Sequence, residues 1–233
     1  MISLKYLAIL VTLLISTIGC NSVKNIDAPS ESAVDKALDV KAPILALKHY
    51  SAGLNIEDFD QSIPYFQIPD APDNYSAGAV LARTIDGLGY RYYWSTHGLR
   101  TEDLQYNPGN EGRSAEETLD HLYGLSNGLM HVAQKTPNER PLVIPEVSFE
   151  ELRKLTLQNF KTASDIFRTV EDVSTHGIIF QRGEKKSEFP VWNVMNGFLA
   201  DAIYHTGQIV SYRRSSGNPQ HPGVNVFMGK TNL

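Results

Sequence analysis

Asp201 and His205 offer a carboxylate and an imidazole four residues apart, within the run DAIYHTGQIVSYRR. Four residues make about one turn of an α-helix, so on a helix the two side chains lean toward the same point. Pairs with this spacing supply two ligands to one divalent ion in helical metal sites. The same spacing is common in helix-surface pairs, which contribute on the order of a few tenths of a kcal/mol. A third donor elsewhere in the chain is therefore needed to favour a metal site over a surface pair.

His121 is the candidate for that third donor. With about 100° of rotation per residue, His205 falls within the apolar face of its helix and Asp201 at the edge of that face. His121 falls at the matching edge of a second helix, which follows Ser114. A bundle that packs these two edges together brings two imidazoles and one carboxylate to one point. That donor set suits Zn²⁺, Ni²⁺, Fe²⁺ or Mn²⁺, and three protein ligands leave coordination positions open for water or a substrate.

Four helical segments must position these donors. The first three follow Ser76, Ser114 and Ser148, and the fourth runs from about Val191 to Ser215. The second and third begin with a capping box, a serine followed three residues later by a glutamate, and Gly217 follows the fourth as a left-handed stop. Between the third and fourth, HGIIFQRGEKKSEFPVW interrupts the helical period and predicts a short hairpin. Four amphipathic helices of roughly 20 residues each favour an all-α fold, a four-helix bundle.

The first 20 residues, MISLKYLAILVTLLISTIGC, have the pattern of a secretory signal peptide. Lys5 supplies a short positive region, and Tyr6 to Ile15 form an apolar stretch that is too short for a comfortable membrane span. The ending TIGC resembles a bacterial lipobox, so Cys20 is the expected lipidation site and the first residue of the mature chain. Several acyl chains on one cysteine give stable anchoring. The alternative is a plain signal peptide whose cleavage site happens to include a cysteine.

These patterns divide the chain into five parts. We expect a signal peptide over 1–20, a polar tether over 21–41, an irregular extension over 42–75, the bundle over 76–217 and a tail over 218–233. The extension contains four prolines, and at most one short helix is expected there, around Ile44 to Tyr50. The bundle is therefore expected on the extracytoplasmic side of a bacterial membrane, periplasmic or at the cell surface.

Composition excludes two classes of function. The net charge of −5 and the isoelectric point of about 5.8 provide no electrostatic footprint for nucleic acid. Cys20 is the single cysteine, so neither an intrachain disulfide nor a catalytic thiolate deeper in the chain is available.

Residues 76–217 resemble the DinB-like superfamily of four-helix bundles, which includes YfiT-type proteins and the bacillithiol and mycothiol S-transferases. The family pattern has one histidine on its second helix and an H-x-x-x-H pair on its fourth, often followed by Gly-Gln. Here LDHLYGL supplies the first position as His121, and DAIYHTGQI supplies the pair as Asp201 and His205, followed by Gly207 and Gln208. Asp201 stands where the family usually has a histidine, and its carboxylate is a harder, anionic ligand.

The resemblance implies a metal-dependent enzyme, in which the ion lowers the pKa of a bound water or activates a thiolate. Hydrolase and thiol S-transferase activities both stay open, and the extracytoplasmic location favours a hydrolase because those thiols are intracellular. The alternative is a non-enzymatic envelope lipoprotein with a degenerate site. The expected partners are a small-molecule substrate and, through the lipid anchor, a membrane, with a homodimer left open.

Five further side chains have expected roles. Gln208, one turn beyond His205, either orients a ligand or makes a structural hydrogen bond. Tyr93 either packs in the core with the neighbouring aromatic residues or lines the mouth of a pocket, and Asp120 is expected to be a solvated charge. Arg213 and Arg214 are expected to interact with the dipole at the C-terminus of their own helix.

Overall fold

The structure is a computed structural model that describes residues 62–233. The predicted signal peptide, the lipidation of Cys20, the tether, the short helix around residues 44–50 and most of the irregular extension lie outside the described residues. Within the described part of the chain, no helix is both long and apolar enough to cross a membrane.

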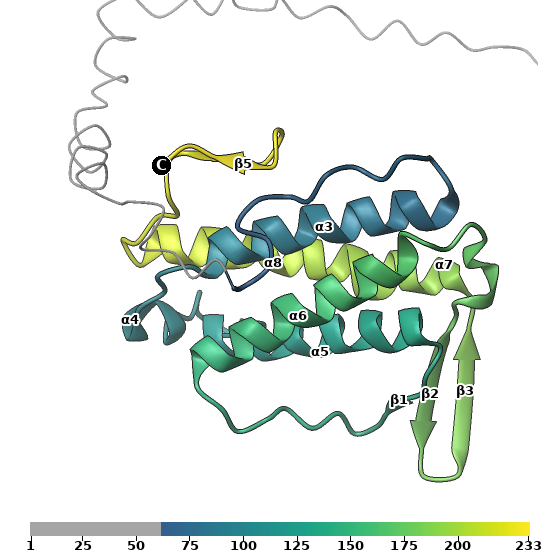
Figure 1. Ribbon diagram of the computed structural model, residues 1–233. Coiled ribbons are helices and arrows are strands. Elements are labelled where there is room, and N and C mark those ends of the chain that lie inside the picture. Colours follow the sequence, from purple (N-terminus) through teal and green to yellow (C-terminus); the bar gives the residue numbers. More distant parts are fainter. Residues whose placement is uncertain (1–61) are drawn as a thin grey trace, which may run out of the picture. The chain divides into compact units, whose positions relative to one another are not determined.

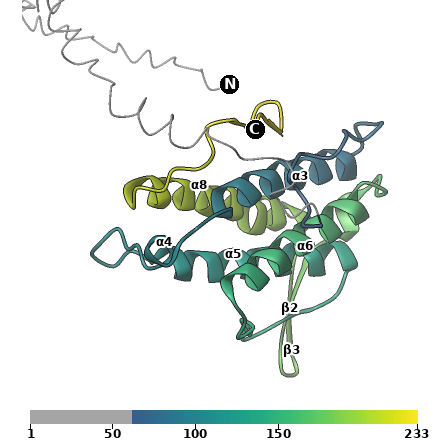
Figure 2. The same cartoon turned by 60° about the vertical axis from the view of Figure 1, so that its left-hand side comes forward.

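Four long helical segments of the described residues pack around one hydrophobic core (Figure 1). They are α3 (Ala77–Thr96), α5 (Ala115–Gln134), α6 (Phe149–Phe167) and a continuous run of α7 (Val191–Asn193), the π-helical segment η3 (Val194–Leu199) and α8 (Ala200–Ser215). α6 packs along both α5 and α3, and α8 lies against α3 and α5. Figures 1 and 2 both place α8 beside α3, and α6 beside α5. The fold is therefore mostly helical, as predicted.

Serine caps begin three of these segments where the sequence predicts them. Ser76, Ser114 and Ser148 each accept a hydrogen bond from the backbone N–H three residues later. Such a cap satisfies one of the unpaired N–H groups of the first turn and contributes about 1 kcal/mol. At Ser114 the capping box is reciprocal with Glu117, whereas at Ser148 the serine half alone is present.

Gly217 ends α8, also as predicted. Its φ of 81° lies in the left-handed region, which glycine adopts at little cost. The N–H of Gly217 donates to the carbonyl oxygen of Arg214, and the N–H of Asn218 donates to that of Arg213. These two bonds form a Schellman motif, which satisfies carbonyl groups at the end of the helix.

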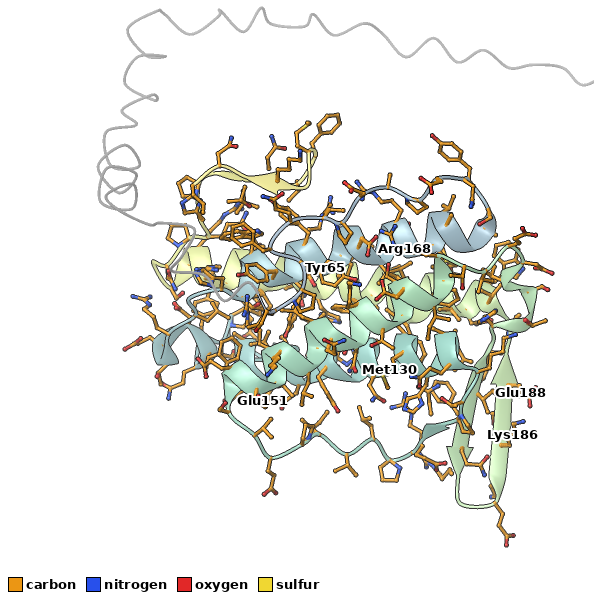
Figure 3. The ribbon with its side chains drawn as sticks, in the orientation of Figure 1. Tyr65, Met130, Glu151, Arg168, Lys186 and Glu188 are labelled. Atoms are coloured by element: carbon orange, nitrogen blue, oxygen red, sulfur yellow. The ribbon has the colours of Figure 1, made fainter. Side chains whose placement is uncertain are left out.

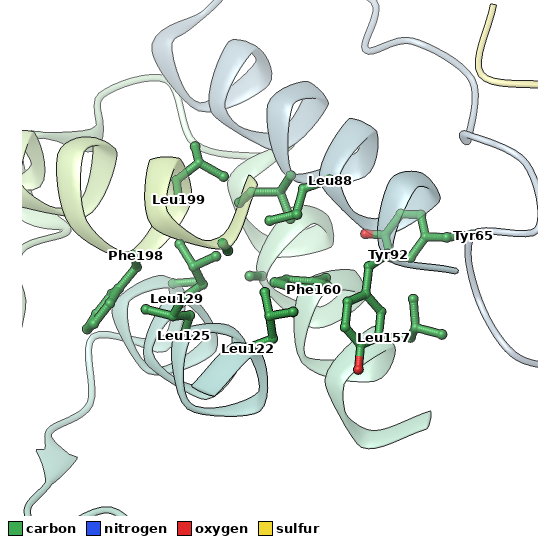
Figure 4. Close-up of a cluster of buried hydrophobic side chains, with 14 of the residues drawn as sticks. Tyr65, Leu88, Tyr92, Leu122, Leu125, Leu129, Leu157, Phe160, Phe198 and Leu199 are labelled. Atoms are coloured by element: carbon green, nitrogen blue, oxygen red, sulfur yellow. The ribbon is translucent and has the colours of Figure 1, made fainter. Parts of the chain in front are cut away.

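Buried aliphatic and aromatic side chains from all four segments meet between the helices (Figure 4). Leu88, Leu122, Phe160 and Leu199 are each at most 2% exposed. Burying a side chain of this size stabilises the fold by about 1.5–3 kcal/mol. This core holds α5 and α8 at a fixed separation, which matters because they carry the candidate ligands.

The predicted hairpin is present beside the helices. β2 (Ile178–Arg182) pairs antiparallel with β3 (Lys185–Phe189), and β1 (Asn138–Glu139) adds a parallel edge to β2. The remaining elements are short: α4 (Thr101–Leu104), the 3₁₀ turn η2 (Val173–Thr175), and the strands β4 (Val224–Asn225) and β5 (Lys230–Thr231). β4 and β5 form a small two-stranded sheet in the predicted tail, which the sequence did not indicate.

The η3 segment is the main departure from the predicted fourth helix. A π-helical turn holds an extra residue relative to an α-helical turn, so it changes which residues face the core beyond it. Val194 and Phe198 are buried within η3, and Ala202 and Ile209 are buried after it. The wide turn ends at Leu199, two residues before Asp201.

Candidate metal centre

The structure brings together the three predicted ligands, His121 from α5 and Asp201 and His205 from α8. One ligand atom from each residue lies within 4.8 Å of the other two. His121 and Asp201 are 80 positions apart in sequence, so the packing of α8 against α5 creates the site.

The carboxylate of Asp201 lies between the two imidazoles. His121 Nε2 is 3.0 Å from Asp201 Oδ2, and His205 Nε2 is 3.3 Å from Asp201 Oδ1. The two imidazole rings are perpendicular, with centroids 4.7 Å apart. Each carboxylate oxygen therefore faces a different ring nitrogen, and all the donor atoms point toward one small region.

Gln208 determines how His205 presents its ring. His205 Nδ1 lies 2.7 Å from Gln208 Oε1, and an amide oxygen can only accept a hydrogen bond. Nδ1 therefore carries the proton, which leaves the lone pair of a neutral imidazole on Nε2, the atom that faces Asp201. In that tautomer the lone pair and a carboxylate oxygen face each other 3.3 Å apart, and a cation between them would satisfy both. Outer hydrogen bonds of this kind orient most metal-binding histidines, so this donor set fits a metal ion.

The three ligands differ in exposure. The side chain of His205 is only 11% exposed, whereas those of His121 and Asp201 are 32% and 39% exposed. The centre is therefore closed on the His205 side and open to solvent on the side of the other two ligands. A small molecule can approach from that open side.

A cavity of about 280 Å³ adjoins His121 on α5. Its other lining residues are Asp120, Gly124, Leu125, Arg140, Leu142, Ile144 and Phe198. Leu142 and Ile144 belong to the loop between β1 and α6, which covers this side of α5. The volume lies near the lower end of the range for small-molecule pockets.

Asp120 and Arg140 are cavity residues that the sequence interpretation missed. Asp120 was expected to be a solvated charge, but it is half-buried in the wall of this cavity. Burial raises the pKa of Asp120, and the nearby charges of Glu116 and Glu117 raise it further. No helical period applies to the loop that contains Arg140, so the apolar run PLVIP was the one available signal.

Tyr93 is placed away from this cavity. It is 1% exposed and packs against Phe66, Trp94 and His97, and the guanidinium of Arg153 lies 4.5 Å from its ring centroid. The residue therefore belongs to a buried aromatic cluster at the C-terminal end of α3.

Arg213 contacts the end of a neighbouring helix as well as the residues just beyond the end of its own, where its Nε donates to the carbonyl oxygen of Asn218. The side chain is 1% exposed, and its Nη1 donates to the carbonyl oxygens of Trp94, Ser95 and His97 at the C-terminal end of α3. Because helix C-termini leave carbonyl groups unpaired, Arg213 ties α8 to α3.

We compared the chain with protein-family models, curated proteins and solved structures, and no match was found in any of the three comparisons.

Proposed function

We propose that this protein is a divalent-metal-dependent hydrolase of the DinB-like superfamily, with His121, Asp201 and His205 as its metal ligands. The convergence of one donor atom from each of the three residues within 4.8 Å is the observation that carries the proposal. The packing of four helical segments around one core supports a four-helix bundle of the DinB/YfiT type. The predicted lipoprotein signal would anchor this bundle outside the cytoplasm, which favours a hydrolase over a thiol S-transferase.

The donor set defines the chemistry of the centre. Two imidazoles and one carboxylate suit Zn²⁺, Ni²⁺, Fe²⁺ or Mn²⁺, and three ligands leave room for a substrate. When bound, such an ion acts as a Lewis acid on a water or thiol. Gln208 holds the Nε2 of His205 toward the centre. Asp120 lines the adjoining cavity with a raised pKa, which suits it to exchange a proton with a bound ligand.

Metal analysis of the purified protein tests this proposal. The wild type is expected to contain close to one divalent ion per chain, and His121→Ala and His205→Ala are expected to lose it. His131→Ala is the matched control, since His131 also lies on α5 but is bonded to Thr136 outside the cluster. Absence of metal at any occupancy in a wild-type protein with a normal helical circular dichroism spectrum would contradict the proposal.

One observation favours a second candidate, a non-enzymatic envelope lipoprotein. The 3.0 Å separation of His121 Nε2 and Asp201 Oδ2 also suits a hydrogen-bonded ion pair without metal. In that case Asp201 would stabilise the contact between α5 and α8 and bind no ion. The same metal analysis separates the two candidates, because the ion pair alone predicts no bound metal.

A further inference from the structure

One face of the β2–β3 hairpin gathers cations and aromatic rings. In the antiparallel pairing, Arg182 lies opposite Lys185 and Phe180 lies opposite Ser187. Residues two apart on a strand point to the same face, and directly opposed residues share that face. These four side chains therefore lie together, and we call this the cationic face.

The opposite face of the hairpin has a different charge arrangement. Lys186 and Glu188 alternate along β3 with the residues of the cationic face and therefore point to the opposite side. They form an ion pair with each other (Figure 3). The strand thus carries two adjacent lysines in contrasting environments. Lys186 has a carboxylate partner, whereas Lys185 faces the positive charge of Arg182 across the pair of strands.

Arg140 adds a third cation beside the cationic face. Its backbone N–H donates to the carbonyl oxygen of Gln181 at 2.7 Å, which fixes it next to β2. Its guanidinium lies 4.7 Å from the centroid of the Phe180 ring. Burial lowers the pKa of Arg140, and the neighbouring charge of Arg182 lowers it further. The position of this guanidinium is therefore held by a backbone bond and an aromatic contact.

These three cations have no carboxylate partner among the described residues, because Arg140, Arg182 and Lys185 take part in none of the salt bridges found there. The chain as a whole carries a net charge of −5, so this concentration of positive charge is local. Like charges directly opposite each other on paired strands are destabilising. A bound anion would remove that repulsion.

A cavity of about 440 Å³ lies over the cationic face, lined by Arg140, Phe180, Arg182, Lys185, Ser187 and Phe189. Arg140 also lines the cavity beside His121, so it borders both spaces. The Phe180 ring contacts Phe198, with ring centroids 6.0 Å apart, and Phe198 lines the cavity beside His121. The two cavities thus share a guanidinium and a continuous aromatic wall.

We propose that the cationic face binds the phosphate group of a small phosphorylated substrate, and that this substrate extends past Arg140 to the candidate metal centre. Three cations match a doubly charged phosphate better than a singly charged carboxylate, and guanidinium groups bind phosphate through paired hydrogen bonds. The rings of Phe180 and Phe189 accommodate an apolar part of the same molecule. The link to chemistry at the centre rests on the proposed function, whereas phosphate binding itself requires no metal.

Calorimetric titration of the purified protein with phenyl phosphate, in the presence of a metal chelator, tests the proposal. Binding is expected, and both Arg182→Gln and Lys185→Gln are expected to weaken it about tenfold, because each removes a charge-assisted hydrogen bond. Lys186→Gln is the matched control, since it removes the same charge from the opposite face of the same strand and is expected to leave the affinity unchanged. All three side chains are exposed, so circular dichroism should show an unaltered fold.

Two further probes separate the parts of the ligand. Phenol lacks the phosphate and inorganic phosphate lacks the ring, so both are expected to bind more weakly than phenyl phosphate. The proposal is overturned if phenyl phosphate does not bind, if Lys186→Gln weakens binding as much as Lys185→Gln, or if phenol binds as tightly as phenyl phosphate.

The outcome of this titration is independent of the metal analysis. Stoichiometric metal without phenyl phosphate binding would leave the proposed function intact and overturn the substrate class. Phenyl phosphate binding by a protein that takes up no metal would support the cationic face and contradict the proposed function alone.

Discussion

At the scale of single residues, Asp201 is the side chain on which the candidate centre depends. It is the only anionic member of the cluster, and its two oxygens face different histidines. A carboxylate neutralises one of the two charges of a divalent ion, whereas an imidazole in its place neutralises none. Asp201 therefore contributes charge as well as a donor atom, and the two contributions can be separated by substitution.

Replacing Asp201 by Asn is expected to weaken metal binding about 10–100-fold, because the variant keeps the shape and an oxygen but loses the charge. Asp201→His restores the H-x-x-x-H spacing of the resembling family and is expected to retain binding. Competition with a chromophoric chelator measures both affinities. Wild-type affinity in Asp201→Asn would show that the carboxylate is not a ligand.

Gln208 is predicted to act as a positioning residue through His205. Gln208→Ala removes the acceptor from Nδ1 and is expected to lower metal affinity about 10–100-fold, the usual effect of losing an outer hydrogen bond. Gln208→Glu keeps an accepting oxygen and should restore most of the affinity. Nitrogen chemical shifts of the imidazole report the tautomer of His205. A tautomer unchanged in Gln208→Ala would contradict this role.

The sequence predicted the cluster of His121, Asp201 and His205 better than it predicted the surroundings of that cluster. Asp201 and His205 are one helical turn apart and His121 lies on a helix edge, so helical periodicity together with the family resemblance selected all three. Asp120 lies about 100° from His121 on the same helix and was assigned to solvent. It lines the cavity because Leu142 and Ile144 cover that side of α5. The path of such a loop cannot be predicted from sequence periodicity, because a loop has no regular repeat.

At the scale of elements, the π-helical segment η3 was not predicted, yet the predicted positions of Asp201 and His205 are correct because both residues lie after it. A uniform helical period over residues 191–215 is wrong across the π-helical turn. Asp201 and His205 both lie beyond that turn, in the regular α8 helix, so their phase relative to Leu199 is unaffected. The predicted edge position therefore holds for the ligands, although the preceding turn was not foreseen.

Deletion of Gly197 tests the importance of the wide turn. Removing one residue takes out the extra residue of the wide turn, so the segments before and after it can join as a regular α-helix with their faces unchanged. Val194 would then stay in the core, and Asp201 and His205 would still face α5. We expect metal binding to be retained, with a change of about 1 kcal/mol or less in the free energy of unfolding.

Gly197→Ala is the matched control for that deletion. A Cβ at this exposed position meets no other atom within 4 Å, and alanine is about 0.5–1 kcal/mol better than glycine within a helix. This variant should therefore be as stable as the wild type or slightly more stable in urea denaturation. A deletion variant that loses its metal, or that unfolds at a much lower urea concentration than Gly197→Ala, would show that the site depends on the π-helical turn.

At the scale of the whole molecule, one end of the helical core combines groups from several elements around His97. Burial, together with the charges of Arg153 on α6, Arg213 on α8 and His221 in the tail, lowers the pKa of His97 from 6.5 to about 4. These positive groups come from three segments that meet at the C-terminal end of α3. The pH dependence of stability should therefore report on the packing of the whole fold.

The sign of this dependence follows from proton binding. Between pH 6.5 and about 4 the unfolded chain takes up a proton at His97 that the folded protein does not. The contribution of His97 to stability is therefore full above pH 6.5 and is lost progressively as the pH falls to about 4. His97→Gln should flatten the urea midpoint across this window. An equally steep fall in the variant would contradict the assignment.

The candidate centre also links two distant parts of the chain, since its ligands on α5 and α8 are 80 positions apart. An ion that binds only the folded protein stabilises it by about 2.7 kcal/mol at a concentration 100-fold above its dissociation constant. For a domain of this size that corresponds to a rise in Tm of roughly 5–10 °C.

Thermal unfolding followed by circular dichroism, with metal and then with chelator, should show this rise in the wild type and in His131→Ala. His205→Ala should show none, because without this ligand the ion no longer holds α8 against α5. An equal rise in His205→Ala would mean that the stabilising ion binds elsewhere on the protein.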